Sequence, residues 1–392
     1  MNEIELSIVM PCLNEADTLA TCIGKAQEAL REAGIAGEVI VADNGSSDGS
    51  CEIAERCGAR LIRVPQHPHP ARNGYGRGLM TGIAAAQGRY VLMGDSDDSY
   101  DFGEAPSFLA KLREGYDLVQ GCRLPSGGGV IRPGAMPWSH RWIGNPLFSF
   151  LVRRWFACPI QDVNCGMRAF RKAWYDSINQ RCTGMEFAAE MIIKAGVFKA
   201  RVAEVPITLH PDGRQSHAPH LKTMRDGWRI LRFLFLYSPT WLYLIPGIIL
   251  VALGVLGYAV ALPGLQIRGV VFDAQTLLFS SVFILCGYQA ILFSLLAKTF
   301  AVNEGLLPMK PGLTRFFEWM NLERSLVLGL MGLVAGLGLF VWALIAWIQV
   351  DFGALDYPRA LRIAIPGALM IVLGFQTIFS SFFASVLGMG KS

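Results

Sequence analysis

The stretch Tyr90-Val-Leu-Met-Gly-Asp95-Ser-Asp97-Asp98-Ser-Tyr-Asp101 decides how the rest of the chain is interpreted. Its first four residues are apolar or aromatic and predict a short buried strand that ends at Gly94. Four carboxylates then follow within seven residues. Two like charges about 4 Å apart repel by about 4 kcal/mol at an effective dielectric of about 20, and a hard divalent cation with oxygen ligands relieves that repulsion. The alternative interpretation is a solvated acidic turn.

Composition divides the chain into two parts. With 52% hydrophobic and 17% charged residues, the 392-residue chain is too apolar for an ordinary soluble protein. Only 14 of its 66 charged side chains lie in residues 237–392. The net charge of +4 is shared evenly by the two parts and gives no indication of nucleic-acid binding. Nine cysteines without a pairing pattern are typical of reduced thiols in a cytosolic domain, and no signal peptide is expected.

Short apolar runs alternate with helical patterns through the first part. The predicted strands are 6–10, 38–42, 60–64, 90–93, 116–121 and 201–205, and the predicted helices are 18–33, 51–57, 73–86, 104–114, 138–156 and 186–195. This alternation predicts a mainly parallel α/β sheet with right-handed crossovers. Ligands of such sheets bind outside the carboxyl ends of the strands. We therefore expect one rim of the sheet to carry Asp43, Asp95, Asp97 and Asp98.

Two glycine-rich segments have a predicted role near a ligand. Asn73-Gly-Tyr-Gly-Arg77-Gly opens a helix, its glycines let the backbone approach a ligand, and its N-terminus attracts anions. A dinucleotide motif would follow the first strand, whereas this run follows the third, so we do not expect a Rossmann cofactor site. Residues 123–137, with Arg123 and Arg132, are either a passive linker or a mobile lid that grips phosphate.

Residues 221–236 predict an interfacial helix just before the apolar part. Apolar residues recur at helical spacing beside a row of cations that consists of Lys222, Arg225, Arg229 and Arg232. The alternative is a core helix of the soluble domain. The predicted domains are therefore 1–220, an amphipathic helix at 221–237, and a transmembrane domain at 238–392.

The transmembrane domain contains four predicted spans, each longer than the roughly 20 residues that cross a bilayer: 241–262, 277–297, 326–350 and 363–387. A second interfacial helix is predicted at 311–320. More Lys and Arg residues lie in the connection 298–325 and the tail than in the opposite loops, which predicts that the soluble domain is cytosolic. The glycine-rich stretch Gly329–Gly338 can pack within one chain or between chains, so a homo-oligomer stays open.

Several motifs taken together resemble family-two glycosyltransferases of the GT-A fold, which are nucleotide-diphospho-sugar transferases. They are Pro11-x-x-Asn14-Glu15, Asp43-Asn-Gly-Ser-Ser-Asp48-Gly, the Gly-Arg77-Gly helix start and Asp95-x-Asp97. Gln161-Asp162 with Cys165-Gly-Met-Arg168, and Gly213-Arg214-x-Ser216 before a basic helix, resemble the polyprenyl-phosphate subgroup that contains dolichol-phosphate mannose and glucose synthases. The four-span tail resembles that of bacterial members, which implies a bacterial inner membrane.

The resemblance implies an integral membrane enzyme with a nucleotide-sugar donor, UDP- or GDP-linked, and a polyprenyl phosphate acceptor. The implied donor-binding residues are Pro11, Asn14, Glu15, Asp43, Arg77 and Asp95. Asp95 and Asp97 are the implied metal residues, with Asp97 binding Mg²⁺ or Mn²⁺ at the diphosphate and Asp95 holding the ribose or a metal-bound water. Ser99 stands where many family members have another residue, so the third metal ligand is not defined.

On the acceptor side, the resemblance implies four arginines that hold the lipid phosphate: Arg123, Arg132, Arg168 and Arg214. A phosphate with a second pKa of about 6 is largely a dianion at neutral pH and needs little help from a base. Asp162 is therefore expected to position the acceptor or the metal first and to act as a base second. Direct attack on the anomeric carbon would invert its configuration.

Three alternatives stay open. The acceptor can be another membrane lipid such as a ceramide or diacylglycerol, whose hydroxyl group needs a base. A processive polysaccharide synthase would carry Gln where Leu151 precedes Arg154-Trp155. A transporter or flippase with a degenerate sugar-binding domain is a third possibility, although charges are nearly absent from the spans.

Overall fold

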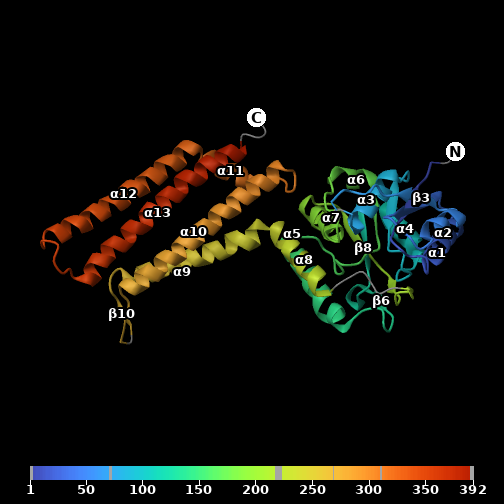
Figure 1. Cartoon of the computed structure of the whole chain (residues 1–392), viewed down its shortest axis with the longest axis horizontal. Coiled ribbons are helices and arrows are strands. Elements are labelled where there is room, and N and C mark those ends of the chain that lie inside the picture. Colours follow the sequence, from blue (N-terminus) through green and yellow to red (C-terminus); the bar gives the residue numbers. More distant parts are fainter. Residues whose placement is uncertain (1–2, 70–72, 217–222, 268, 310, 389–392) are drawn as a thin grey trace. The chain divides into compact units, whose positions relative to one another are not determined.

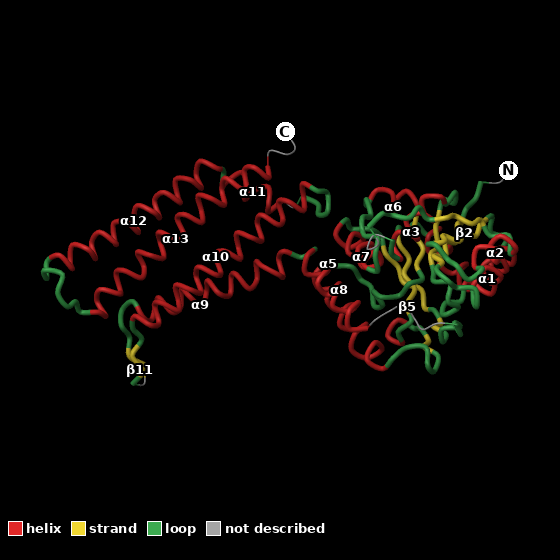
Figure 2. The backbone as a smooth tube through the Cα atoms, in the orientation of Figure 1, coloured by secondary structure: helices red, strands yellow, loops and turns green. Residues whose placement is uncertain are grey.

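The computed structural model describes residues 3–69, 73–216, 223–267, 269–309 and 311–388. The chain divides into two compact units, Met1–Leu234 and Phe235–Ser392. The first unit is an α/β domain and the second consists mainly of long helices (Figures 1 and 2). The predicted α/β sheet and the predicted set of apolar C-terminal helices are both confirmed.

The first unit is built on a mixed, mainly parallel sheet with the strand order β3-β2-β1-β4-β7-β5-β8. Strand β7 runs antiparallel to β4 and β5, whereas the other neighbouring pairs are parallel. The strands are β1 (Leu6–Cys12), β2 (Gly37–Asp43), β3 (Arg60–Arg63), β4 (Tyr90–Met93), β5 (Leu118–Cys122), β7 (Arg168–Arg171) and β8 (Val202–Pro206). A second parallel pair joins β6 (Val130–Ile131) to β9 (Thr208–Leu209).

Helices connect these strands and cover both faces of the sheet, and the last of them, α8, follows the final strand. They are α1 (Leu19–Glu32), α2 (Ser50–Arg56), α3 (Tyr75–Ala85), α4 (Ala105–Arg113), α5 (Asn145–Phe156), α6 (Lys172–Ser177), α7 (Glu186–Val197) and α8 (Thr223–Leu236). Shorter helical turns are η2 (Phe102–Glu104), η3 (Pro125–Gly127) and η4 (His140–Gly144). The predicted helix 138–156 is therefore divided between η4, a π-helical turn, and α5.

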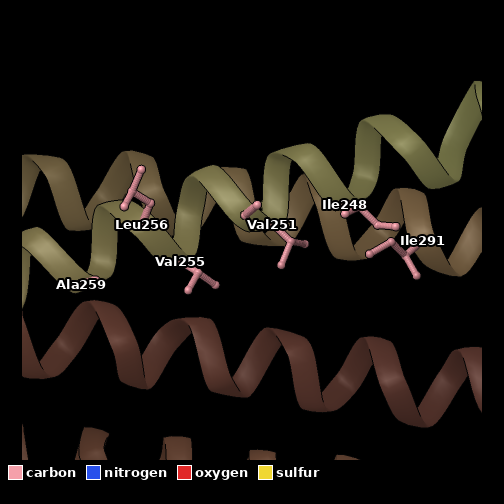
Figure 3. A pocket seen from close by; sticks show the side chains of 7 residues that line it. Ile248, Val251, Val255, Leu256, Ala259 and Ile291 are labelled. Atoms are coloured by element: carbon pink, nitrogen blue, oxygen red, sulfur yellow. The ribbon is translucent and has the colours of Figure 1, made fainter.

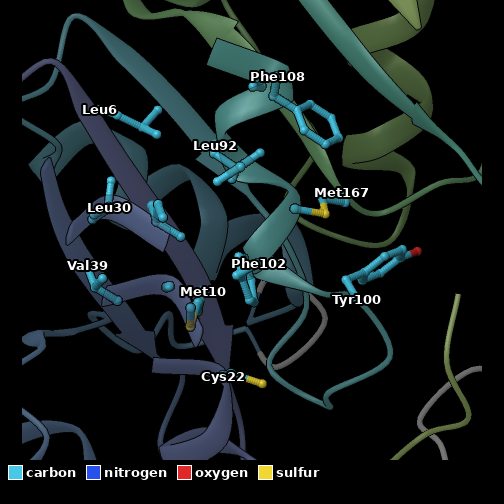
Figure 4. Close-up of a cluster of buried hydrophobic side chains, with 14 of the residues drawn as sticks. Leu6, Met10, Cys22, Leu30, Val39, Leu92, Tyr100, Phe102, Phe108 and Met167 are labelled. Carbon is cyan, nitrogen blue, oxygen red and sulfur yellow. The ribbon is translucent and has the colours of Figure 1, made fainter. Parts of the chain in front are cut away.

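The main core lies between the sheet and helices α1 and α4 (Figure 4). Alternate residues of β1, namely Leu6, Ile8 and Met10, point into this cluster, as the period of two in a strand requires. Val9 points to the opposite face, where α3 packs so closely that a Cβ on Gly82 would lie 2.6 Å from the Val9 side chain. Each large apolar side chain buried in this way stabilises the fold by about 1.5–3 kcal/mol.

The second unit contains four helices that are long and apolar enough to cross a membrane, among the residues that the structure describes. Their spans are Thr240–Ala261, Ala274–Asn303, Leu322–Ile348 and Tyr357–Gly388. These correspond to η5 (Thr240–Leu244) with α9 (Ile245–Ala261), α10 (Ala274–Asn303), α12 (Leu322–Ile348) and α13 (Tyr357–Gly388). A short hairpin of β10 (Gln266–Ile267) and β11 (Val270–Val271) precedes α10, and α11 (Pro311–Trp319) precedes α12.

The four long helices lie in the row α9, α10, α13, α12 (Figure 1). A groove of about 530 Å³ runs along α9 and α10 and is lined by apolar side chains such as Val251, Val255 and Ile291 (Figure 3). Because these side chains carry no polar group, the groove can offer hydrocarbon contact and no further chemistry.

Small residues set the closest approaches within the two helix pairs. A Cβ on Gly254 of α9 would lie 2.6 Å from the Ser280 carbonyl oxygen of α10. A Cβ on Gly336 of α12 would lie 2.7 Å from the Gly367 carbonyl oxygen of α13. The same close packing recurs two turns away in each pair, between Gly247 and Gly287 and between Gly329 and Gly374. These glycines therefore pack within the chain, as small residues do at membrane helix interfaces.

We predict that Gly329→Ala destabilises the second unit and that Gly338→Ala, on the same helix, does not. A Cβ at position 329 would lie 2.7 Å from Ile378 and 3.0 Å from the Gly374 carbonyl oxygen. At position 338 no described atom lies within 4 Å. Overpacking costs about 1–3 kcal/mol, whereas Ala is the better helix former at an open position. Thermal unfolding of the purified full-length variants measures the difference, and equal Tm values would contradict this packing.

Candidate active site

The loops that follow β1 and β2 are joined by hydrogen bonds at the carboxyl end of the sheet. Asn14 has a left-handed backbone with φ of 59°, its backbone N–H donates to Ser46 Oγ at 2.9 Å, and its side-chain oxygen accepts from the Ser47 N–H at 2.8 Å. The Glu15 N–H donates to Ser50 Oγ at 3.0 Å. The structure therefore brings the predicted donor-binding residues of the first two strands together.

Asp43 lies at the end of β2 and shapes its own turn. Its buried carboxylate accepts hydrogen bonds from the backbone N–H groups of Gly45 and Ser46, both at 3.1 Å. These contacts hold the turn against the loop after β1, because Ser46 also bonds to Asn14. The Asp43 carboxylate thus fixes the turn after β2 and, through Ser46, its contact with the loop after β1.

Asp95 is held in a half-buried position directly after β4. One carboxylate oxygen accepts a hydrogen bond from the Tyr75 hydroxyl at 2.7 Å. The other approaches the backbone so closely that a Cβ on Gly166 would lie 2.6 Å away, so this contact requires glycine. Burial and the nearby charge of Asp97 raise the Asp95 pKa to about 6, because both disfavour its ionised form.

Asp97 contacts both the acidic stretch and a distant arginine. Its Oδ1 accepts from the Ser99 hydroxyl at 2.6 Å and the Ser99 N–H at 3.1 Å, and its Oδ2 accepts from Arg214 Nη2 at 3.1 Å. Asp98 is bound instead by Lys25 Nζ at 2.8 Å, and Asp101 accepts from the Gly103 N–H at the start of η2. The four carboxylates of the acidic stretch therefore have different partners, and Ser99 orients Asp97.

Arg214 connects three segments that are far apart in the sequence. Its guanidinium donates to Asp212, at 2.6 to 2.9 Å, and to the carboxylates of Glu15 and Asp97 at 3.1 Å each. Burial opposes the positive charge, but these carboxylates outweigh it and raise the Arg214 pKa. The sequence assigned Arg214 to the acceptor phosphate, whereas in this structure it neutralises the carboxylates predicted for the donor and the metal.

Arg123 and Asp162 form a buried bidentate ion pair. Arg123 Nε and Nη2 donate to the two Asp162 oxygens at 2.7 and 2.8 Å, and the Arg123 backbone N–H donates to the same carboxylate at 3.0 Å. Asp162 thereby raises the Arg123 pKa despite the opposing effect of burial. Because both oxygens of Asp162 accept hydrogen bonds from Arg123, Asp162 fixes the position of the Arg123 guanidinium.

A second group of side chains, which sequence reasoning missed, holds this ion pair in place. The Glu204 carboxylate accepts from the backbone N–H groups of Gln161 and Asp162 at 2.8 and 3.1 Å. Gln120 donates to the Asp162 carbonyl oxygen at 3.0 Å. Tyr100 lies at the edge of the core cluster, and its hydroxyl accepts from the Gly166 N–H at 2.8 Å (Figure 4).

The other missed residues are Tyr75 and Asp212. Tyr75 stands between the glycines that open α3, and Asp212 stands two residues before Arg214. Tyr100 lies within the acidic stretch itself. Tyr75, Tyr100 and Asp212 could therefore have been predicted, because each lies next to a predicted site residue or motif in the sequence. Glu204 and Gln120 carried no such signal, because they lie on strands far from Asp162 in the sequence.

The remaining predicted arginines lie in different surroundings. Arg168 is completely buried, donates to the carbonyl oxygens of Ala188 and Cys165 at 2.8 and 2.6 Å, and has its pKa lowered by burial. This placement differs from the expected phosphate contact, because its donors hold backbone. Arg77, in the first turn of α3, donates from Nε to the Pro65 carbonyl oxygen at 2.8 Å. Arg132 is exposed next to β9.

Two of the glycines that open α3 pack closely against protein, and the predicted approach of a ligand to this run stays a prediction. A Cβ on Gly74 would lie 2.7 Å from the Thr183 carbonyl oxygen. A Cβ on Gly76 would lie 2.7 Å from both the Cys182 carbonyl oxygen and Phe187 Cβ. The loop before α7 therefore occupies the space that these glycines leave open.

The described residues contain no group of three or more His, Cys, Asp or Glu side chains placed to hold a metal ion. Mg²⁺ is nevertheless commonly bound by one or two carboxylates together with substrate phosphates. Burial first and the charge of Asp97 second raise the pKa of Asp95, whereas Arg214 and Arg123 lower it. The oxygen donors of Asp95 and Asp97 therefore fit a divalent cation that arrives with a phosphate ligand.

Comparisons with known proteins now identify the class of this chain. Residues 7–178 match the model of glycosyl transferase family 2, and residues 295–388 match the family 2 C-terminal transmembrane region. The chain belongs to glycosyltransferase family 2: it is an integral membrane enzyme with a GT-A-like domain.

Two curated relatives come from Haloferax volcanii. The low-salt glycan biosynthesis hexosyltransferase Agl6 is 35% identical over 384 residues, which cover 98% of this chain and 89% of that protein. A dolichyl-phosphate hexose transferase is 31% identical over 204 residues, 52% of this chain and 82% of that protein. Among solved structures, glucosyl-3-phosphoglycerate synthase from Mycobacterium tuberculosis matches with a TM-score of 0.46 and 21% identity over 59% of this chain and 79% of that one.

We predict that Asp162→Asn lowers stability strongly and that the double variant Arg123→Met with Asp162→Asn recovers most of the loss. The single change leaves a buried guanidinium without its counter-charge, which costs about 3–5 kcal/mol. In the double variant the charge is gone, and the Asn oxygen can still accept from the backbone N–H of residue 123. Thermal unfolding of the three proteins tests this, and wild-type stability of Asp162→Asn would contradict a buried ion pair.

Proposed function

We propose that this enzyme transfers a hexose from a nucleotide-sugar to a polyprenyl phosphate in the membrane, with inversion at the anomeric carbon. The proposal rests on one edge of the sheet, where two carboxylates and two arginines lie together. Arg214 binds Asp97, and the charges of Arg214 and Arg123 both lower the pKa of Asp95. Carboxylates suit a cation with a diphosphate, and arginines suit a second phosphate. The names of the two Haloferax relatives support a hexose and a lipid phosphate.

On the donor side, the joined loops after β1 and β2 form the base and ribose site. Pro11, Asn14, Glu15 and Asp43 belong to these loops, and Arg77 lies in the first turn of α3, whose N-terminus favours anions. Asp95 and Asp97 hold Mg²⁺ or Mn²⁺, which when bound neutralises the charge that develops on the leaving nucleoside diphosphate. Tyr75 and Ser99 keep the two carboxylates in fixed orientations.

On the acceptor side, Arg214 gives up part of its contacts with carboxylates and binds the lipid phosphate. This exchange occurs when the donor occupies Asp95 and Asp97. Its guanidinium already contacts Asp97, so a phosphate drawn to it lies next to the donor site. Arg132 is exposed and adds a second positive charge on the loop after β5. Asp162 holds Arg123 in place, and the dianionic acceptor attacks with little need for a base.

In this proposal the membrane half keeps the enzyme in the bilayer that holds a lipid acceptor. Helices α8 and α11 lie in the interface, and the four spans anchor the catalytic unit at the cytosolic surface. Arg229 of α8 is bound to Glu186 of α7 at 3.0 Å, so this cation holds the helix to the catalytic unit. Lys222, the first cation of the predicted row, lies outside the described residues.

The bidentate ion pair that Asp162 forms with Arg123 favours the phosphate acceptor over a hydroxyl acceptor such as ceramide or diacylglycerol. A hydroxyl group must lose its proton as it attacks, and this needs a base with a free oxygen within hydrogen-bond reach. Both Asp162 oxygens accept from Arg123, and Asp97 accepts from Ser99 and Arg214. A phosphate acceptor needs no such group.

We predict that the purified full-length enzyme transfers labelled hexose from a UDP- or GDP-sugar to undecaprenyl or dolichyl phosphate in the presence of Mn²⁺. Label recovered in the organic phase measures the product, and unphosphorylated prenol is the control acceptor. Equal labelling of ceramide or diacylglycerol would instead establish a hydroxyl acceptor. An inert, folded protein across the whole screen of donors would favour a transporter.

We predict that Asp97→Asn removes the dependence of turnover on divalent cations, whereas Asp98→Asn keeps it. Asp98 is the matched control because it belongs to the same acidic stretch but is bound by Lys25. Metal assistance worth about 3 kcal/mol corresponds to a loss of about a hundredfold in rate. Initial rates are measured against Mn²⁺ concentration for both variants. Identical metal titrations for Asp97→Asn and the wild type would refute the assigned role.

A further inference from the structure

Helix α7 buries an ion pair that the candidate active site does not include. Glu190 and Lys194 lie one helical turn apart, their charged atoms are 2.7 Å apart, and their side chains are 0% and 1% exposed. A buried pair of this kind is often no more stabilising than apolar side chains of similar volume. The neighbouring residues Met191, Ile192 and Ile193 already bury apolar side chains in the core. The two charges therefore serve a purpose other than the burial of α7.

Both charges hold segment 179–184, which precedes α7. Glu190 Oε2 accepts from the backbone N–H groups of Arg181 and Cys182 at 3.0 and 2.7 Å. Lys194 Nζ donates to the Asn179 carbonyl oxygen at 2.6 Å, where the backbone is left-handed with φ of 47°. Burial opposes the charge of Glu190, but its hydrogen bonds outweigh burial and keep its pKa below the ordinary value. The carboxylate therefore stays ionised at neutral pH and keeps these contacts.

Segment 179–184 in turn holds the first turn of α3, which lies beside α7 (Figure 1). The Thr183 carbonyl oxygen accepts from the Arg77 N–H at 3.0 Å. The same oxygen would lie 2.7 Å from a Cβ on Gly74, so the two backbones are in direct contact. Tyr75 stands between Gly74 and Arg77, and its position therefore depends on these contacts.

We propose that the ion pair of α7 is a positioning element for the acidic site, because it fixes segment 179–184 and thereby keeps the Tyr75 hydroxyl on Asp95. The last contact is the hydrogen bond of 2.7 Å from this hydroxyl to Asp95 Oδ1. Removal of a group that orients a metal-binding carboxylate typically costs tenfold to a hundredfold in metal affinity. Only this effect on a metal rests on the proposed function, because the chain of contacts from α7 to Asp95 is independent of it.

Hydrogen exchange tests the link from α7 to α3. The variant Glu190→Met with Lys194→Met removes both charges and keeps apolar volume in the core. In the control, Glu190→Gln with Lys194→Met, the Gln oxygen can still accept from the N–H groups of residues 181 and 182. In the purified full-length enzyme, mass spectrometry should show about tenfold faster exchange at the Arg77 amide in the first variant and not in the control. Equal exchange in the two variants would overturn the proposal.

A second variant disturbs the same contact from α3 and decides the question if the first variant does not fold. Gly74→Ala places a Cβ 2.7 Å from the Thr183 carbonyl oxygen, so it should also speed exchange at the Arg77 amide. Wild-type exchange in a Gly74→Ala protein would mean that segment 179–184 does not hold α3, and the proposal would then be wrong.

Electron paramagnetic resonance of bound Mn²⁺, in the presence of UDP or GDP, tests the effect on the site. The double Met variant and Tyr75→Phe should each weaken Mn²⁺ binding about tenfold. The two changes combined should cause no further loss, because both remove the same contact with Asp95. A merely structural role of the ion pair predicts additive losses, and additive losses would refute action through Tyr75.

These measurements separate the inference from the proposed function. If exchange and Mn²⁺ binding change as expected but the wild type transfers no sugar, the proposed function fails and the positioning role stands. If the wild type binds no Mn²⁺, the assigned metal site fails, and exchange at the Arg77 amide decides the positioning role. If sugar is transferred but exchange is the same in all variants, the positioning role alone fails.

Discussion

The site depends on the charge balance around Arg214. A buried guanidinium is costly unless carboxylates surround it, and clustered carboxylates repel unless a positive charge lies among them. Glu15, Asp97 and Asp212 satisfy both requirements and come from the loop after β1, the loop after β4 and the segment after β9. The same ion pairs therefore close the fold at this edge and set its electrostatics.

This balance constrains what can enter the site. A cation that binds Asp97 takes away a partner of Arg214, and an anion that binds Arg214 takes it away from the carboxylates. Arg214 keeps Glu15 and Asp212 as partners when a cation takes Asp97, and three carboxylates around one guanidinium leave an excess of negative charge. The cluster can therefore accept a cation without leaving the guanidinium unpaired.

How much of this could be predicted from the sequence depends on how local each interaction is. The strand Tyr90–Met93 and the four apolar helices were predicted within a few residues at most ends, because an apolar run of given length has few possible structures. Strand β7 was missed, because Arg168-Ala-Phe-Arg171 is short, has charged ends and gains its stability from β4 and β5. The Asn73–Gly78 run was correctly predicted to open a helix. The sequence alone, however, does not tell whether a glycine makes room for a ligand or for a carbonyl oxygen of the protein.

The site shows the same division. Asp97 and Ser99 are neighbours in sequence, and their contact belongs to the acidic stretch itself. The contact of Arg214 with Glu15 spans 199 residues, and that of Arg123 with Asp162 spans 39, so the sequence suggested the residues but could not pair them. The burial of Arg168 could not be predicted from the sequence either. An arginine in a motif looks the same whether it binds phosphate or, as Arg168 does, backbone carbonyl oxygens.

The membrane half relies on a different balance of forces. Lipid is as apolar as the helices, so their association depends on close packing and hydrogen bonds. Glycine pairs provide the packing within α9–α10 and within α12–α13. Between the two pairs, Tyr288 bonds to Thr377 at 2.7 Å and Gln376 to Gln289 at 2.9 Å across α10 and α13. Polar side chains are thus placed where two helix pairs need a fixed register, which explains their presence in spans otherwise almost free of charge.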